Sequence, residues 1–302
     1  MTAARQVLPD KTHLVTRVCV GRQHLLHGGR VVNATIEYLL ALGCARFGLE
    51  LCGYVFMSNH LHIVVHDPYG RLPQFTEFLH GLLARALNSV RGRRGAFWEA
   101  EQVNVAELAD GEKVLDKIAY AMANPTRAGL VERGEDWIGP RSRPEDYLRP
   151  RTIERPNLPF FADGTLPESV ELRLCVPPSH AHLTPEEFAA EVAARAEEKE
   201  AEARADVKRQ GRRFLGPVRL RALDWRRAAT TLQAHGAGRV IKPTVLASDK
   251  ATRNAVLARI KLFRHEYAIA RAAFRSGDTG VLFPAGTYHV VVHLGARAHP
   301  PP

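Results

Sequence analysis

Residues 53–66 constrain the fold of this chain more than any other segment, because β-branched and apolar residues dominate them. Their composition predicts two strands, and Ser58 and Asn59 between the strands indicate a two-residue turn. Successive side chains of a strand point to opposite faces, so His60 and His62 share one face and the apolar residues beside them occupy the other. The sequence therefore predicts two neighbouring imidazoles on a sheet with an apolar reverse side.

The segments around this hairpin alternate between strand and helix patterns. Apolar residues recur at about every second position in the predicted strands and at every third or fourth position in the predicted helices. The predicted strands are residues 13–20, 49–57, 60–67 and 102–106, and the predicted helices are residues 31–47 and 72–90. This order is that of a ferredoxin-like sandwich, in which both helices cover one face of an antiparallel sheet. We therefore predict an α+β fold with the histidine face open to a substrate.

A third helix is predicted over residues 110–124, where apolar residues again recur at helical spacing. Tyr120 and Asn124 are four residues apart, so they lie on the same face of that helix. Pro125 is expected to end the helix, because proline disfavours helical conformation in the residue before it. Each residue also has an ordinary interpretation: Tyr120 as an aromatic at the edge of the core, and Asn124 as a helix-ending residue.

The composition is that of a globular protein with an anionic partner. Of the 302 residues, 45% are hydrophobic and 25% are charged, and no apolar segment approaches the roughly 20 residues that span a membrane. The beginning of the chain lacks a secretory signal, so we expect a cytoplasmic protein with reduced cysteines and no membrane partner. The net charge is +10 and lies mostly in residues 151–302, which suits a nucleic acid.

The second half of the chain is predicted to be a separate region. Residues 139–168 are rich in proline and arginine and are interpreted as a linker between a domain at 1–138 and a mainly α-helical, basic C-terminal extension at 169–302. Thr184 and Glu187 form a capping box that opens a long helix. Further helices are predicted at 225–234 and 252–275, and a β-like segment at 281–293.

Two histidines on a strand, with a tyrosine and an asparagine on a helix, could support metal-assisted attack on a phosphate. A divalent ion on two imidazoles and one oxygen keeps positions free for phosphate oxygens. A His-x-His pair alone is more often structural, however. His66 shares the same face but lies farther along the strand, so we interpret it as a possible DNA contact. Tyr54 and Tyr69 are rival nucleophiles to Tyr120.

Three blocks of sequence in a fixed order resemble the REP-associated tyrosine transposases, which belong to the single-tyrosine HUH transposase superfamily. They are residues 54–65 with the central His-Leu-His, the pair Phe97-Trp98, and residues 120–131, which read Tyr-Ala-Met-Ala-Asn-Pro-Thr-Arg-Ala-Gly-Leu-Val. The resemblance covers about residues 10–135. It implies the HUH nuclease form of the ferredoxin-like fold and metal-dependent nicking and rejoining of single-stranded DNA at hairpins or palindromic repeats.

The same resemblance assigns roles to individual residues. It implies that His60, His62 and Asn124 bind Mg²⁺ or Mn²⁺, and that Tyr120 is the nucleophile that forms a 5′-phosphotyrosine intermediate. Related transposases often carry glutamine at the position of Asn124. Small members of the family end soon after the Gly-Leu-Val motif, whereas this chain continues for well over a hundred residues.

Several arginines and lysines are candidate contacts to single-stranded or hairpin DNA. They are Arg91, Arg93 and Arg94 after the second helix, and Lys208, Arg209, Arg212 and Arg213 at the end of the long charged helix. The predicted protein acts as a monomer or a homodimer. The alternative is a domesticated protein that binds DNA hairpins without cutting them, and a plain metal-binding or RNA-binding ferredoxin-like protein is a third option.

Overall fold

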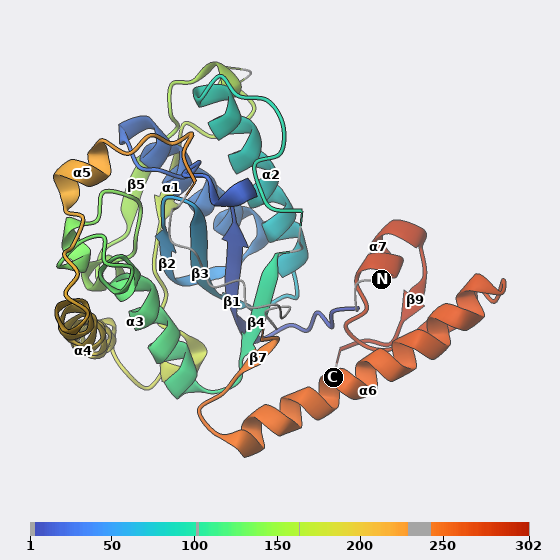
Figure 1. The fold of residues 1–302 in the computed structure, drawn as a ribbon. Helices are drawn as coiled ribbons and strands as arrows, with labels where there is room; N and C mark the ends of the chain where they lie inside the picture. Colours follow the sequence, from blue (N-terminus) through green and yellow to red (C-terminus); the bar gives the residue numbers. More distant parts are fainter. Residues whose placement is uncertain (1–3, 101–102, 163, 229–242, 302) are drawn as a thin grey trace.

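A five-stranded sheet with strand order β2-β3-β1-β4-β7 forms the centre of the protein (Figure 1). We describe residues 4–100, 103–162, 164–228 and 243–301 of a computed structural model. The strands are β1 (Lys11–Val18), β2 (Glu50–Phe56), β3 (His60–Asp67), β4 (Asn104–Leu108) and β7 (Val245–Leu246). β1 to β4 pair antiparallel with their neighbours, and β7 pairs parallel with β4.

Two helices, α1 (Arg30–Phe47) and α2 (Leu72–Val90), pack on each other and cover one face of the sheet (Figure 1). Leu61, Ile63 and Val65 of β3 are fully buried in the main hydrophobic cluster. The order β2-β3-β1-β4 with two helices on one face is the predicted ferredoxin-like arrangement. The predicted fold class is therefore confirmed.

The opposite face of the sheet carries a helix, so the prediction that this face is open was wrong. Helix α3 (Gly111–Arg127) contacts β2 and β3. A Cβ atom at Gly53 would lie 3.3 Å from the Ile118 side chain, so glycine allows α3 to approach the sheet closely. Val55 and Ala121 are fully buried in a second hydrophobic cluster. These apolar residues need a cover, and α3 supplies it.

Helix α3 does not end at Pro125, as the sequence had suggested, but continues to Arg127. A proline in the last turn removes only one backbone donor, and the chain still closes through the bond from the Leu130 N–H to the Pro125 carbonyl at 3.0 Å. Gly129 follows with a φ of +70°, a left-handed conformation that glycine adopts at helix ends. The stop signal is therefore this glycine.

The long charged helix forms as predicted. Helix α4 (Pro185–Arg209) begins with the capping box, in which the Glu187 N–H donates to Thr184 Oγ1 at 3.2 Å and the Thr184 N–H donates to a Glu187 carboxylate oxygen at 2.8 Å. It packs along α3. The remaining regular elements are β5 (Arg151–Glu154), β6 (Ser169–Leu172), α5 (Pro217–Arg221), α6 (Lys250–Arg275), β8 (Leu282–Phe283), α7 (His289–Leu294) and β9 (Arg297–Ala298), with short 3-10 turns at Val20–Arg22, Gly134–Asp136, Pro144–Tyr147, Pro159–Phe161 and Pro178–His180.

Three predictions for the C-terminal region have different outcomes. The helix predicted at 252–275 is confirmed as α6, which extends away from the sheet (Figure 1). Residues 225–228 form a turn instead of a helix, and residues 229–234 lie outside the described residues. The prediction of a β-like segment at 281–293 was wrong. Only β8 is extended, because Pro284 and Gly286, which has a φ of +84°, interrupt the strand, and α7 follows.

The segment predicted as a linker starts along the outer edge of β2. The Phe56 N–H donates to the Pro140 carbonyl at 2.8 Å, and the Ser142 N–H donates to the Tyr54 carbonyl at 2.9 Å. The hairpin of β5 and β6 then packs on α1. The division into domains stays a prediction. Within the described ranges, no helix combines the length and apolar composition needed to cross a bilayer.

We predict that Gly139→Ala destabilises the protein by about 1–3 kcal/mol, the usual cost of overpacking. A Cβ atom there would lie 2.7 Å from the Trp137 indole nitrogen and 2.8 Å from the Phe56 carbonyl oxygen. Gly81→Ala is the control, because Gly81 is exposed in α2 with open space around it. This variant should raise the free energy of unfolding by about 1 kcal/mol, the helix propensity difference between alanine and glycine. Urea denaturation measures the free energy of unfolding of both variants, and equal effects of the two substitutions would contradict this packing.

Candidate active site

His60 and His62 lie side by side at the start of β3, as predicted. Their ring centroids are 5.0 Å apart with an interplanar angle of 83°. In the sheet, His62 is opposite Thr16 of β1 and Val55 of β2, so it occupies the centre of the face that α3 covers.

A hydrogen bond holds the Nδ1 atom of each imidazole. Thr16 Oγ1 lies 2.9 Å from His62 Nδ1, and Asn59 Oδ1 accepts a bond from His60 Nδ1 at 2.8 Å. The Nε2 atom of each ring is thus the nitrogen left for a further interaction, the arrangement found where histidine binds a metal. The sequence did not identify Thr16 and Asn59 as partners of the imidazoles, because only the strand register and the turn bring them to the rings.

Both imidazoles are neutral at neutral pH. Burial lowers the pKa of His62 to about 3, with smaller contributions from His60 and Lys117. Burial also lowers the pKa of His60 to about 4, aided by Arg22. A neutral imidazole offers a lone pair, so both rings are in the state that a metal ion requires.

Tyr120 of α3 contacts His62 directly. Its ring centroid lies 5.5 Å from that of His62, with an interplanar angle of 78°. The Lys117 Nζ atom is 5.0 Å and the Arg127 Cζ atom 5.2 Å from the Tyr120 ring centroid. Two cations therefore flank Tyr120, to which the transposase resemblance assigns the role of nucleophile.

The sequence contained an unused signal for these cations. Lys117, Tyr120, Asn124 and Arg127 follow one another at spacings of three, four and three residues, which places all four on one stripe of a helix. Sequence reasoning used only the middle pair. Reading the stripe one turn further in each direction would have found the lysine and the arginine.

Asp116 fixes the lysine beside the tyrosine. One carboxylate oxygen lies 2.9 Å from Lys117 Nζ, and the other accepts a hydrogen bond from Lys199 of α4 at 2.6 Å. Burial opposes the charge of Asp116, but the bonds from Lys199 and Lys117 outweigh it and lower its pKa to about 2. The C-terminal half of the chain thus helps to build the site.

Asn124 lies one helical turn after Tyr120 and is buried, with 6% of its surface exposed. No hydrogen bond of its side chain to another described residue is found, so its amide oxygen remains available. In the described part of the chain, no three histidine, cysteine, aspartate or glutamate side chains form a metal-binding group. An ion here would therefore combine the imidazoles of His60 and His62 with this amide and with oxygens from outside the protein.

The rival tyrosines belong to the other side of the sheet. Tyr54 is fully buried and donates to Glu37 of α1 at 2.9 Å, and burial together with Glu37 raises its pKa well above the usual range. Tyr69 is 63% exposed, and its ring lies against Gly48 at the end of α1. Neither tyrosine contacts the two imidazoles.

His66 is separate from the histidine pair and is buried. Its Nδ1 atom lies 3.1 Å from Thr12 Oγ1, and its Nε2 atom lies 3.3 Å from a carboxylate oxygen of Asp10. Both ring nitrogens therefore have partners within the protein, which supports a structural role.

The arginines predicted to bind DNA after α2 differ in their surroundings. Arg91 donates to the carbonyls of Leu25 and His27 at 2.9 and 3.0 Å and stacks on Trp225. Arg93 also donates within the protein, to an Asn88 side chain and a carbonyl, whereas Arg94 is exposed. Their contacts to DNA stay predictions.

The basic cluster at the end of α4 is exposed and lies beside the end of α3. Lys208, Arg209, Arg212 and Arg213 all face solvent. The Leu215 N–H donates to the Gly129 carbonyl at 3.1 Å, which ties the segment after α4 to the turn that follows Arg127. The structure thus brings this cluster toward the helix that carries Tyr120, although the two are distant in sequence.

Comparison with known proteins finds a similarity only among solved structures. No protein-family model and no curated protein matches the chain. The chain is similar to a REP-associated tyrosine transposase bound to a REP hairpin, with 14% identity and a TM-score of 0.41 over 49% of this chain and 87% of that one. It is also similar to a candidate transposase from Deinococcus radiodurans R1, with 20% identity and a TM-score of 0.28 over 35% of this chain and 84% of that one.

The transposase resemblance seen in the sequence is therefore met again among solved structures. At these scores it carries no argument about activity. About half of this chain also lies outside the larger match. The case for a function rests on the side chains around Tyr120.

We predict that His62 of the metal-free protein stays neutral down to about pH 3. An unfolded chain takes up this proton near pH 6.5. Between these two values the unfolded state binds more protons than the folded state, so the free energy of unfolding decreases as the pH falls through this window. NMR titration of the His62 ring and urea denaturation from pH 7 to pH 4 measure the two effects. A His62 titration midpoint near 6.5 would overturn the prediction.

Proposed function

We propose that this protein is a metal-dependent single-stranded DNA endonuclease and strand transferase of the HUH type. The observation that carries the proposal is the contact of the Tyr120 ring with His62, which itself lies beside His60. A tyrosine on a helix, against one of two adjacent neutral imidazoles whose Nε2 atoms have no partner among the described residues, provides a nucleophile beside candidate metal ligands, as tyrosine attack on a phosphodiester needs.

The residues present offer two imidazoles and one amide oxygen, a set that can hold Mg²⁺ or Mn²⁺ once water and phosphate supply the further oxygen ligands that these ions prefer. His60, His62 and Asn124 would hold the ion, since the two imidazoles are neutral and the asparagine oxygen has no other partner among the described residues. When bound, such an ion supplies polarisation of a phosphate oxygen. Thr16 and Asn59 would keep the rings oriented through their bonds to Nδ1.

The protein's own side chains would carry out the transfer. Tyr120 Oη would attack phosphorus and lose its proton while the bond from phosphorus to the 3′ oxygen breaks. The 3′ oxygen takes up a proton, which leaves a free 3′-hydroxyl and a 5′-phosphotyrosine. Lys117 and Arg127, at 5.0 and 5.2 Å from the tyrosine ring, would bind the phosphate oxygens during this step. Attack by a 3′-hydroxyl on the phosphotyrosine would rejoin a strand.

The substrate would be single-stranded or hairpin DNA. The net charge of +10 and the exposed cluster at the end of α4 suit a phosphate backbone that passes the end of α3. Such an enzyme would be cytoplasmic and would associate with the nucleoid when bound to DNA.

We predict that the protein forms a covalent adduct with a single-stranded hairpin oligonucleotide from a palindromic repeat when Mn²⁺ is present. Tyr120→Phe should abolish the adduct because the attacking oxygen is missing, whereas Tyr54→Phe and Tyr69→Phe should retain it. Denaturing electrophoresis of a labelled oligonucleotide detects the product. Hairpin binding that persists in Tyr120→Phe and without metal, with no adduct from the wild type, would replace this proposal with the non-cleaving hairpin-binding alternative.

We also predict that Thr16→Val weakens Mn²⁺ binding by about 10- to 100-fold, the usual cost of losing a partner that orients a ligating histidine. Thr12→Val is a matched control, because Thr12 contacts His66 Nδ1 at 3.1 Å in the same way but outside the site. Calorimetric titration with Mn²⁺ compares the two variants. Equal Mn²⁺ affinities of Thr16→Val and Thr12→Val would contradict a role of His62 as a metal ligand.

A further inference from the structure

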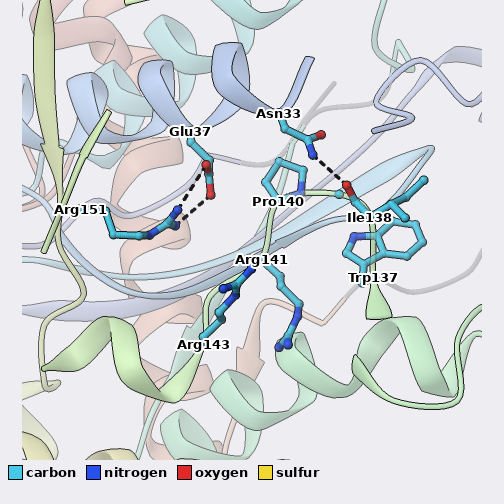
Figure 2. Close-up of a pocket in the computed structure, with 9 residues that line it drawn as sticks. Asn33, Glu37, Trp137, Ile138, Pro140, Arg141, Arg143 and Arg151 are labelled. Carbon is cyan, nitrogen blue, oxygen red and sulfur yellow. Dashed lines mark hydrogen bonds and ion pairs between the residues drawn. The ribbon is translucent and has the colours of Figure 1, made fainter. Parts of the chain in front are cut away.

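A small polar pocket of about 160 Å³ lies at the outer edge of β2, beside α1 (Figure 2). Side chains from three parts of the chain line it, and most of them are polar or charged. The lining residues are Asn33, Glu37, Trp137, Ile138, Gly139, Pro140, Arg141, Arg143 and Arg151. It includes none of the residues of the candidate active site.

Internal bonds fix the walls of this pocket. Asn33 donates to the Ile138 carbonyl at 2.7 Å (Figure 2). The Trp137 indole donates to the Phe56 carbonyl at 3.1 Å. On the other side, Arg151 donates to Glu37 at 2.9 Å. The pocket is therefore formed without a ligand, which lowers the entropy cost of binding one.

The three arginines of the pocket are not equivalent. Arg151 is neutralised by Glu37 and by Asp146, whose carboxylate oxygen lies 3.2 Å from its Nε atom. Among the described residues, no carboxylate lies within ion-pair distance of the Arg141 or Arg143 side chain. Burial lowers the pKa of Arg141, and the nearby charge of Arg143 lowers it further. Two guanidinium groups of like charge thus stand close together, and neither is held in an ion pair with a described residue. The carboxylates of Glu200, Glu145 and Asp146 act on Arg141 from a greater distance and offset part of this repulsion.

The space around these two arginines is larger than the pocket itself. Arg141 and Arg143 also line a hollow of about 500 Å³ against α4. Asn33 and Trp137 also line a hollow of about 480 Å³ at the start of α1. A group bound between the arginines would therefore have room on either side for the rest of a larger molecule.

We propose that this pocket binds a phosphate monoester, held by Arg141 and Arg143. Guanidinium groups donate paired hydrogen bonds whose geometry matches phosphate oxygens. A phosphate monoester presents three such oxygens and up to two negative charges, so it satisfies both arginines at once. The group could come from free phosphate or a nucleotide, or from the phosphorylated end of a DNA strand. This site does not depend on the proposed nuclease activity.

Calorimetric titration of the full-length protein tests the site, first with inorganic phosphate and then with short oligothymidines with and without a 5′-phosphate. We expect Arg141→Gln and Arg143→Gln each to weaken phosphate binding by about tenfold, since each removes a charge-assisted contact. Arg149→Gln is the control, because Arg149 is an exposed residue of the same segment that does not line the pocket. Arg143 is also exposed, so its replacement should leave the fold intact.

The oligothymidines distinguish the two sources of the phosphate. A preference for the phosphorylated strand that is lost in Arg143→Gln would support binding of a strand end, and equal affinity for both strands beside clear binding of inorganic phosphate would support a free phosphate or nucleotide. The loss of phosphate binding caused by Arg143→Gln should persist in the Tyr120→Phe background, which separates this site from the nuclease. Absence of phosphate binding, or equal losses in Arg143→Gln and Arg149→Gln, would overturn the proposal.

Discussion

Alternation of side chains along β3 is the constraint on which the rest of the structure depends. Leu61, Ile63 and Val65 face α1 and α2, and burial of each such side chain stabilises the fold by about 1.5–3 kcal/mol. A register shift of one residue would move all three to the face under α3 and would place the histidines against α1 and α2. The positions of His60 and His62 are therefore set by the same apolar residues that hold the sheet to its helices.

The electrostatics of the histidine face favour an anion. His60 and His62 are uncharged at neutral pH because burial lowers the pKa of each, and the side chains of Lys117 and Arg127 lie against the Tyr120 ring. Asp116 is the nearby carboxylate, but two lysines already pair with it. The result is a surface on which Lys117 and Arg127 place positive charge beside Tyr120, while the pairing of Asp116 with two lysines offsets its negative charge. Because one of those lysines belongs to α4, the extension influences the charge balance as well as the shape of this face.

The sequence predicted the parts of the site that depend on local periodicity. Strand alternation predicted that His60 and His62 are neighbours, and helical spacing placed Tyr120 and Asn124 on one face. It could not predict that α3 crosses the histidine face, because that depends on the close approach that Gly53 permits. Nor could it predict which arginines the protein uses internally, since a guanidinium that binds backbone carbonyls has the same sequence pattern as one that binds DNA.

Both edges of the sheet are covered by later parts of the same chain. Residues 140–142 pair with β2, and β7 pairs with β4. An uncovered edge strand invites pairing with other chains and aggregation. A version of this protein that ends near residue 138 would thus uncover two edges that the later residues protect. The residues after 138 are therefore part of what keeps β2 and β4 from pairing with other chains.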